Sequence, residues 1–146
     1  MDKNLKQAYF QIIEGGIQEY AFFKENYDPT VPEFQLKSTI SFQFTQDTNV
    51  LTSNAGITIN QNGIPVLKCT ISFDYSLLEE TIREFTKCKQ IVIPRDILIY
   101  FGSNALGALR GAIMAKLETT TFRFILPPVN LGDIIKESLT IERDTN

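Results

Sequence analysis

The stretch Phe34–Thr45 reads FQLKSTISFQFT, and its apolar and polar residues alternate with a period of two. Phe34, Leu36 and Ile40 share one parity with Phe42 and Phe44, while Lys, Gln, Ser and Thr fill the other. This period is typical of a β-strand with one face toward a core. Because parallel strands are usually buried on both faces, the pattern favours an antiparallel sheet.

Downstream of this strand, the sequence predicts a β-hairpin. Ile57 and Ile59 lie on one face of its first arm, and Asn62-Gly63 follows as the turn, since both residues tolerate positive φ. The return arm alternates again. Residues 51–75 are therefore predicted to form two antiparallel strands. The apolar parity of the return arm consists of Leu67, Cys69, Ile71, Phe73 and Tyr75.

Upstream, two strand-favouring stretches flank a pair of glycines. Tyr9–Ile13 and Ile17–Phe23 are rich in β-formers, and Gly15-Gly16 separates them. We interpret this segment as one long first strand with a bulge or bend at the glycines.

The period changes after the hairpin, which predicts helices. Residues 77–85 suit a short helix, Pro94 can start a longer one that reaches about Leu117, and Asn130 can cap a final helix from Leu131 to about Leu139. Strands followed by helices indicate an α+β fold. We expect a single domain, 1–146, with a four-stranded antiparallel sheet and with the long helix and a short C-terminal helix packed on one face.

Small residues recur at spacings of three and four in the long predicted helix, so they share one face. Such a stripe permits close approach of a sheet, another helix or a second subunit. We predict an oligomer interface on this face. It comprises Phe101, Gly102, Ala105, Ala108, Leu109, Ala112 and Ala115.

Composition argues against catalysis and against nucleic-acid binding. The chain has no histidine, so a Ser-His triad, a Cys-His pair and a histidine metal site are excluded. Its two cysteines have no metal-ligand spacing, and a net charge of -3 does not favour nucleic acid. The segment 102–107 has glycines at its ends but lacks the lysine of a phosphate-binding loop. We expect no enzyme activity, cofactor or metal, and a small-ligand or enzymatic domain is the weakest alternative.

The termini and hydropathy give the expected location. No apolar signal-peptide core is present near the N-terminus, and no run approaches the ~18 apolar residues of a membrane span. We expect a cytoplasmic protein without membrane insertion.

Aromatic residues are abundant and point to binding. The chain has eleven Phe and five Tyr. Phe22, Phe23 and Tyr27 are too dense to all face inward from one strand, and Phe122 and Phe124 precede two prolines that forbid regular structure. Some of these rings are expected at a contact surface. Burial of the rings by oligomerisation alone is the alternative.

The region from Ile93 to Leu131 resembles the C-terminal half of the SecB family of protein-export chaperones. Pro94 stands where the family's long helix begins, Phe122 takes an aromatic position, and residues 126–131 read LPPVNL, close to a Leu-x-Pro-Val-Asn-Phe signature. Upstream, Tyr20–Asn26 and Val66–Cys69 are collinear with family strands. The chain departs from the family at Ser72–Leu77, where a glycine-led segment is usual, and it keeps only Glu19 of an acidic patch that contacts the export motor SecA.

The resemblance implies a holding chaperone without ATP, which binds unfolded or precursor polypeptides in apolar grooves. It also implies a homotetramer built as a dimer of dimers, with Glu19 as a motor contact. A SecB-like chaperone dedicated to one partner, such as an antitoxin, and a non-enzymatic adaptor module are the alternatives. The residues implied in client binding are Phe22, Phe23, Tyr27, Phe122, Phe124, Leu126, Leu131 and Ile134.

Overall fold

The alternating segments form one four-stranded antiparallel sheet in the computed structural model, which describes residues 10–143. Its strands are β1 (Phe10–Phe22), β2 (Gln35–Thr45), β3 (Val50–Gln61) and β4 (Ile64–Leu77), in the order β1-β4-β3-β2. The predicted strands are confirmed, and β1 and β2 are the two edges. Tyr9, at the predicted start of the first strand, lies outside the described residues.

The strand register places the apolar parity of every strand on one side. Ile40 pairs with Ala55, Ala55 with Ile71, and Ile71 with Ile17, so one row of apolar side chains crosses all four strands. Directly opposed residues of paired strands share a face. Lys37, Thr58 and Lys68 form a corresponding row on the other face. The sheet therefore has one apolar and one polar face, as period two predicts.

The hairpin turn is the one the sequence predicts. Asn62 and Gly63 have φ values of 51° and 77°, as the two-residue turn requires, and Gln61 pairs with Ile64 across it. Irregularities in β1 lie on both sides of its glycines, at Ile12/Glu14 and Ile17/Glu19. A Cβ on Gly15 would lie 2.3 Å from the Phe73 ring, whereas a Cβ on Gly16 would meet nothing within 4 Å.

Gly15→Ala is expected to destabilise the protein by about 1–3 kcal/mol, because its methyl group must displace the Phe73 ring. Gly16→Ala is the matched control, and we expect it to be neutral or slightly stabilising. Urea unfolding of both variants measures the difference. Equal unfolding midpoints would show that the ring moves aside without cost.

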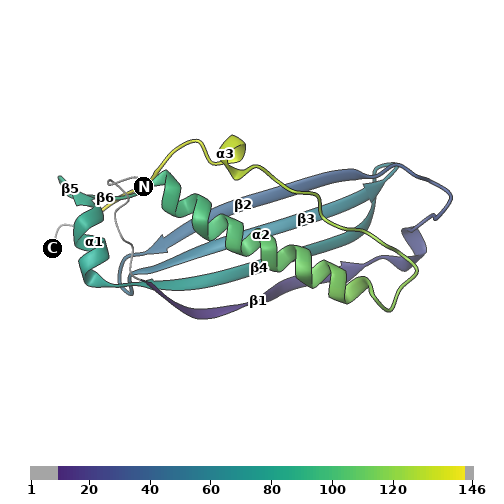
Figure 1. Cartoon of the computed structure of the whole chain (residues 1–146), viewed down its shortest axis with the longest axis horizontal. Coiled ribbons are helices and arrows are strands. Elements are labelled where there is room, and N and C mark those ends of the chain that lie inside the picture. The colour runs from purple at the N-terminus through teal and green to yellow at the C-terminus, as the bar shows by residue number, and fades with distance from the viewer. Residues whose placement is uncertain (1–9, 144–146) are drawn as a thin grey trace.

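The helix α2 (Arg95–Leu117) lies diagonally across the apolar face of the sheet (Figure 1). Phe101, Ala105 and Leu109 are among its fully buried residues, and Asn104 donates a hydrogen bond to the Tyr75 hydroxyl of β4 (2.9 Å). Pro94 is the residue that caps α2 and not its first helical residue. α2 is long and apolar enough to span a membrane by length and composition, and the buried residues of one of its faces pack within the core of the chain. A shorter helix, α1 (Glu79–Phe85), follows β4 and confirms the short helix predicted over residues 77–85, although it begins two residues later.

After α2 the chain runs back over the same face of the sheet without regular structure (Figure 1). We call residues 119–130 the strap. It leads to α3 (Leu131–Ile134), where the Asn130 side chain accepts a hydrogen bond from the Gly132 amide (3.0 Å). The predicted cap is confirmed. The predicted extension of this helix to Leu139 is wrong, because the chain becomes extended at Ile135.

A second, small sheet contains three strands that the sequence analysis did not predict. These are β5 (Thr86–Lys87), β6 (Gln90–Ile93) and β7 (Leu139–Glu142), in that order. Ile91 pairs with Ile141, and Leu139 and Ile141 of the last strand are partly buried against the core. A short 3-10 helix, η1 (Lys24–Asn26), connects β1 to the loop before β2.

Candidate functional site

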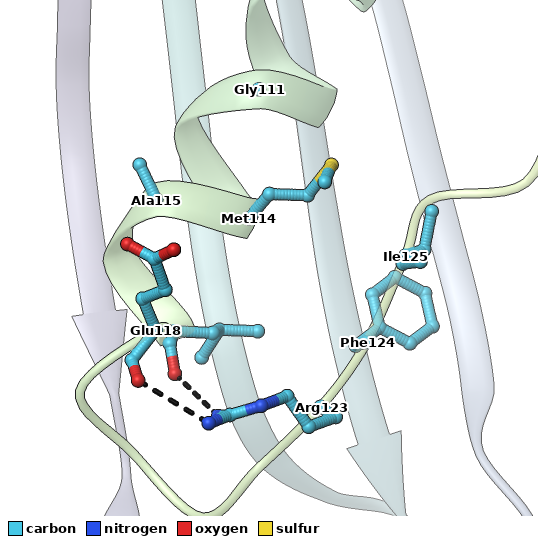
Figure 2. A pocket seen from close by; sticks show the side chains of 8 residues that line it. Gly111, Met114, Ala115, Glu118, Arg123, Phe124 and Ile125 are labelled. Carbon is cyan, nitrogen blue, oxygen red and sulfur yellow. Dashed lines mark hydrogen bonds between the residues drawn. The ribbon is translucent and has the colours of Figure 1, made fainter.

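Arg123, on the strap, ties the start of the strap to the end of α2. Its guanidinium donates hydrogen bonds to the carbonyls of Leu117 (2.8 Å) and Glu118 (3.3 Å) (Figure 2), and it also donates to the carbonyl of Thr120. Two of these carbonyls belong to the last turn of the helix, where carbonyls lack helical partners and favour a cation. Arg123 therefore closes the connection between α2 and the strap.

Arg110, on α2, holds the strap further along. Its Nε donates to the Leu126 carbonyl (2.9 Å) and its guanidinium to the Pro127 carbonyl (3.4 Å). Arg95 makes corresponding contacts beside α3. These contacts give Arg95 and Arg110 a structural role, because each guanidinium donates to backbone carbonyls.

The inner side of the strap is an aromatic cluster. Phe122 is fully buried, and its ring centroid lies 5.8 Å from Phe22, 4.8 Å from Tyr27 and 5.4 Å from Phe34. Phe124 lies 6.2 Å from Phe122 at the outer edge of the same cluster. These rings fix the strap on the sheet, and Phe122 itself is not accessible to a ligand.

An apolar groove lies between the last turns of α2 and the strap (Figure 2). It has a volume of about 710 Å³, and two large apolar side chains stand open beside it: Met114, 48% exposed, and Ile125, 67% exposed. Gly111 and Ala115 have little or no side chain, so the helix does not fill the groove at these two positions. We call it the strap groove. It is lined by Gly111, Met114, Ala115, Leu117, Glu118, Arg123, Phe124 and Ile125.

The residues predicted for client binding separate into two groups. Phe124 lines the strap groove, and Ile134 is exposed beside a second, smaller groove with Ile40 and Phe42 of β2. The others do not meet in one surface. Phe22, Phe23 and Tyr27 are half-buried, whereas Phe122, Leu126 and Leu131 are buried.

For the three buried residues, the prediction of direct contact with a client needs correction, since they are already covered within the single chain. Sequence reasoning missed Met114 and Ile125. An apolar residue on an exposed helix position is the one signal that could have identified Met114.

Much of the small-residue face of α2 is already buried by packing within the single chain. Phe101, Gly102, Ala105 and Leu109 are buried without any second subunit, and a Cβ on Gly102 would meet the Leu131 side chain at 3.2 Å. Packing on the sheet and on α3 therefore accounts for these four, which corrects their assignment to an oligomer interface. Ala108 and Ala112 are half-buried, Ala115 lines the strap groove, and for these three an interface stays a prediction.

Glu19 lies on the polar face of the sheet, away from the strap. Its carboxylate pairs with the Lys68 ammonium at 3.3 Å, and both side chains are about half exposed (51% and 47%). An exposed pair of this kind contributes little to stability. Its role as a motor contact stays a prediction.

Within the described part of the chain, the titratable groups near the core do not form a reactive constellation. Burial raises the pKa of the Cys69 thiol and that of the Tyr75 hydroxyl, which keeps both neutral at ordinary pH. Within residues 10–143, no group of three or more acidic or cysteine side chains is placed to hold a metal ion. Glu118 and Arg123 are the charged residues that line the strap groove.

Comparison with known proteins gives distant structural likenesses. No protein-family model matches the chain, and no curated protein matches it by sequence. One similar solved structure is a SecB-like chaperone of Mycobacterium tuberculosis in complex with a ChAD peptide from the HigA1 antitoxin, at 10% identity and a TM-score of 0.46 over 82% of this chain and 93% of that chain. Another is a Streptococcus agalactiae protein of unknown function, at 12% identity and a TM-score of 0.42 over 86% and 100%.

Proposed function

We propose that this protein binds non-native polypeptides in the strap groove and holds them without nucleotide. The observation that carries the proposal is the open apolar groove, with Met114 and Ile125 exposed beside it. Apolar side chains of an unfolded chain would gain ~25 cal/mol for each Å² that they bury there. An exposed apolar surface of this kind is a typical contact site.

The polar groups of the groove favour a client of loose specificity over a defined small ligand. The guanidinium of Arg123 already donates to backbone carbonyls, and Glu118 stands at one end of the groove. A small-ligand site usually adds several convergent polar groups that fix orientation. A groove that offers mainly apolar contact instead suits varied sequences.

Three further properties are proposed on the basis of the sequence alone. They are a non-enzymatic role, a cytoplasmic location and a homotetrameric assembly. Light scattering of the purified protein measures the assembly. Affinity capture from native cells would separate a spread of clients from one stoichiometric partner such as SecA or an antitoxin.

The protein is expected to suppress aggregation of a guanidinium-denatured enzyme on dilution, with no nucleotide added. Ile125→Asp should raise the concentration needed for half-suppression about tenfold or more, because a charge at the groove removes roughly 1.5–3 kcal/mol of apolar contact. Light scattering during dilution measures both effects.

Leu78→Asp is the matched control, since Leu78 is 50% exposed at the cap of α1, away from the groove. It should behave like the wild type. Failure of the wild-type protein at excess over several clients would refute the proposed function. Equal losses in both variants would place the client elsewhere.

A further inference from the structure

The strap has few fixed contacts with α2, and they lie on either side of the strap groove. Arg123 and Thr120 hold its first residues, where the Thr120 amide donates to the Leu117 carbonyl at 2.9 Å. Beyond the groove, Arg110 is the polar tie to the helix. Among residues 10–143, the backbone groups of Phe124 and Ile125, which border the groove, have no hydrogen-bond partner.

The side chains of the strap fix its height above the sheet but not its distance from α2. Phe122 and Leu126 are both buried and pin the strap inward on either side of the groove. Their apolar contacts are non-directional. The hydrogen bonds of Arg110, in contrast, join a set point on the helix to the carbonyls of Leu126 and Pro127, and such charge-assisted bonds are directional and strong.

We infer that Arg110 is a positioning residue that sets the width of the strap groove and thereby the size of the client side chains it accepts. This inference rests on the proposed function. Arg110 immediately precedes Gly111, a lining residue that contributes no side chain, so the helix offers no side chain at position 111 to fill the groove if the strap moves outward. Loss of the Arg110 hydrogen bonds would then widen the groove at Phe124 and Ile125.

Arg95 supplies a matched control on the same helix. Its guanidinium donates to the Ile135 carbonyl (2.6 Å) and the Gly132 carbonyl (2.8 Å), so it also joins α2 to two carbonyls of the C-terminal segment. It lies about 22 Å from Arg110 along the axis, at 1.5 Å per residue. Arg95→Met and Arg110→Met therefore remove the same chemistry at different distances from the groove.

The test measures the size preference of the groove. Two fluorescein-labelled peptides of equal length and charge, one with Val and one with Trp at its apolar positions, are titrated by fluorescence anisotropy. Arg110→Met is expected to shift the ratio of the two affinities toward the Trp peptide by about fivefold or more, on the scale at which apolar pockets discriminate size. Arg95→Met should leave the ratio at the wild-type value.

A purely structural role of Arg110 would weaken both peptides equally, and an unchanged ratio in Arg110→Met would overturn the inference. If Arg110→Met does not fold, Arg110→Lys decides by the same ratio, because lysine keeps the charge but lacks the fork that reaches both carbonyls. A wild-type protein that binds neither peptide and does not suppress aggregation would instead refute the proposed function.

Discussion

Ala105→Glu is expected to unfold the protein and not merely to separate its subunits. Ala105 is 0% exposed within the single chain, on the face of α2 that packs against the sheet. Glutamate there would bury an unpaired carboxylate and overfill a packed position, at a cost of at least about 4 kcal/mol. This is a large part of the ~5–15 kcal/mol that holds a typical domain together. Circular dichroism and urea unfolding measure the loss.

Ala115→Glu is the matched control, because it makes the same change on the same helix at an exposed position. We expect its unfolding midpoint to stay close to that of the wild type. Its client binding should weaken, since Ala115 lines the strap groove. An Ala105→Glu protein that keeps its unfolding midpoint but loses mass in light scattering would restore an oligomer interface at this residue.

The contrast between Ala105 and Ala115 shows what helical spacing can predict. A spacing of three and four places small residues on one face and indicates close packing. It does not identify what packs there. Gly102 lies against Leu131, and this contact depends on the path of a strap that contains no regular structure.

The strands could be predicted where a pattern among neighbouring residues, such as alternation or a turn dipeptide, determines the structure. Period two determined the apolar parity of β2 and β4, and Asn62-Gly63 determined the hairpin that joins β3 to β4, because both residues accept positive φ. In the turn between β5 and β6, Cys88 (φ 48°) and Lys89 (φ 66°) also have positive φ angles. Neither residue type signals such a turn, so the small sheet was missed.

The strap groove could not be read from sequence because its two sides are brought together only by tertiary packing. Met114 is on the helix and Ile125 on the strap, and neither shares a local pattern with the other. The aromatic residues before the prolines drew attention to the right segment. Their burial, however, divides them: Phe122 builds the core beneath the strap, while Phe124 reaches the groove.

Phe122→Ala is expected to destabilise the protein by about 3–5 kcal/mol, because it removes a fully buried ring and leaves a cavity. The loss should be near the upper end of this range, since three neighbouring rings, Phe22, Tyr27 and Phe34, lose their shared contact at once. Urea unfolding measures it. Phe124→Ala, at the half-buried edge of the same cluster, should cost roughly 1–2 kcal/mol by its smaller burial.

The loss of client affinity should rank Phe122→Ala and Phe124→Ala in the opposite order to the loss of stability. Measured where both are folded, Phe124→Ala should weaken the peptides more than Phe122→Ala, because Phe124 lines the strap groove and Phe122 does not. The reverse order, with Phe122→Ala stable but unable to bind, would mean that the strap opens to expose Phe122 to the client. The pair of variants thus separates a groove that is already formed from one that forms only when the strap lifts.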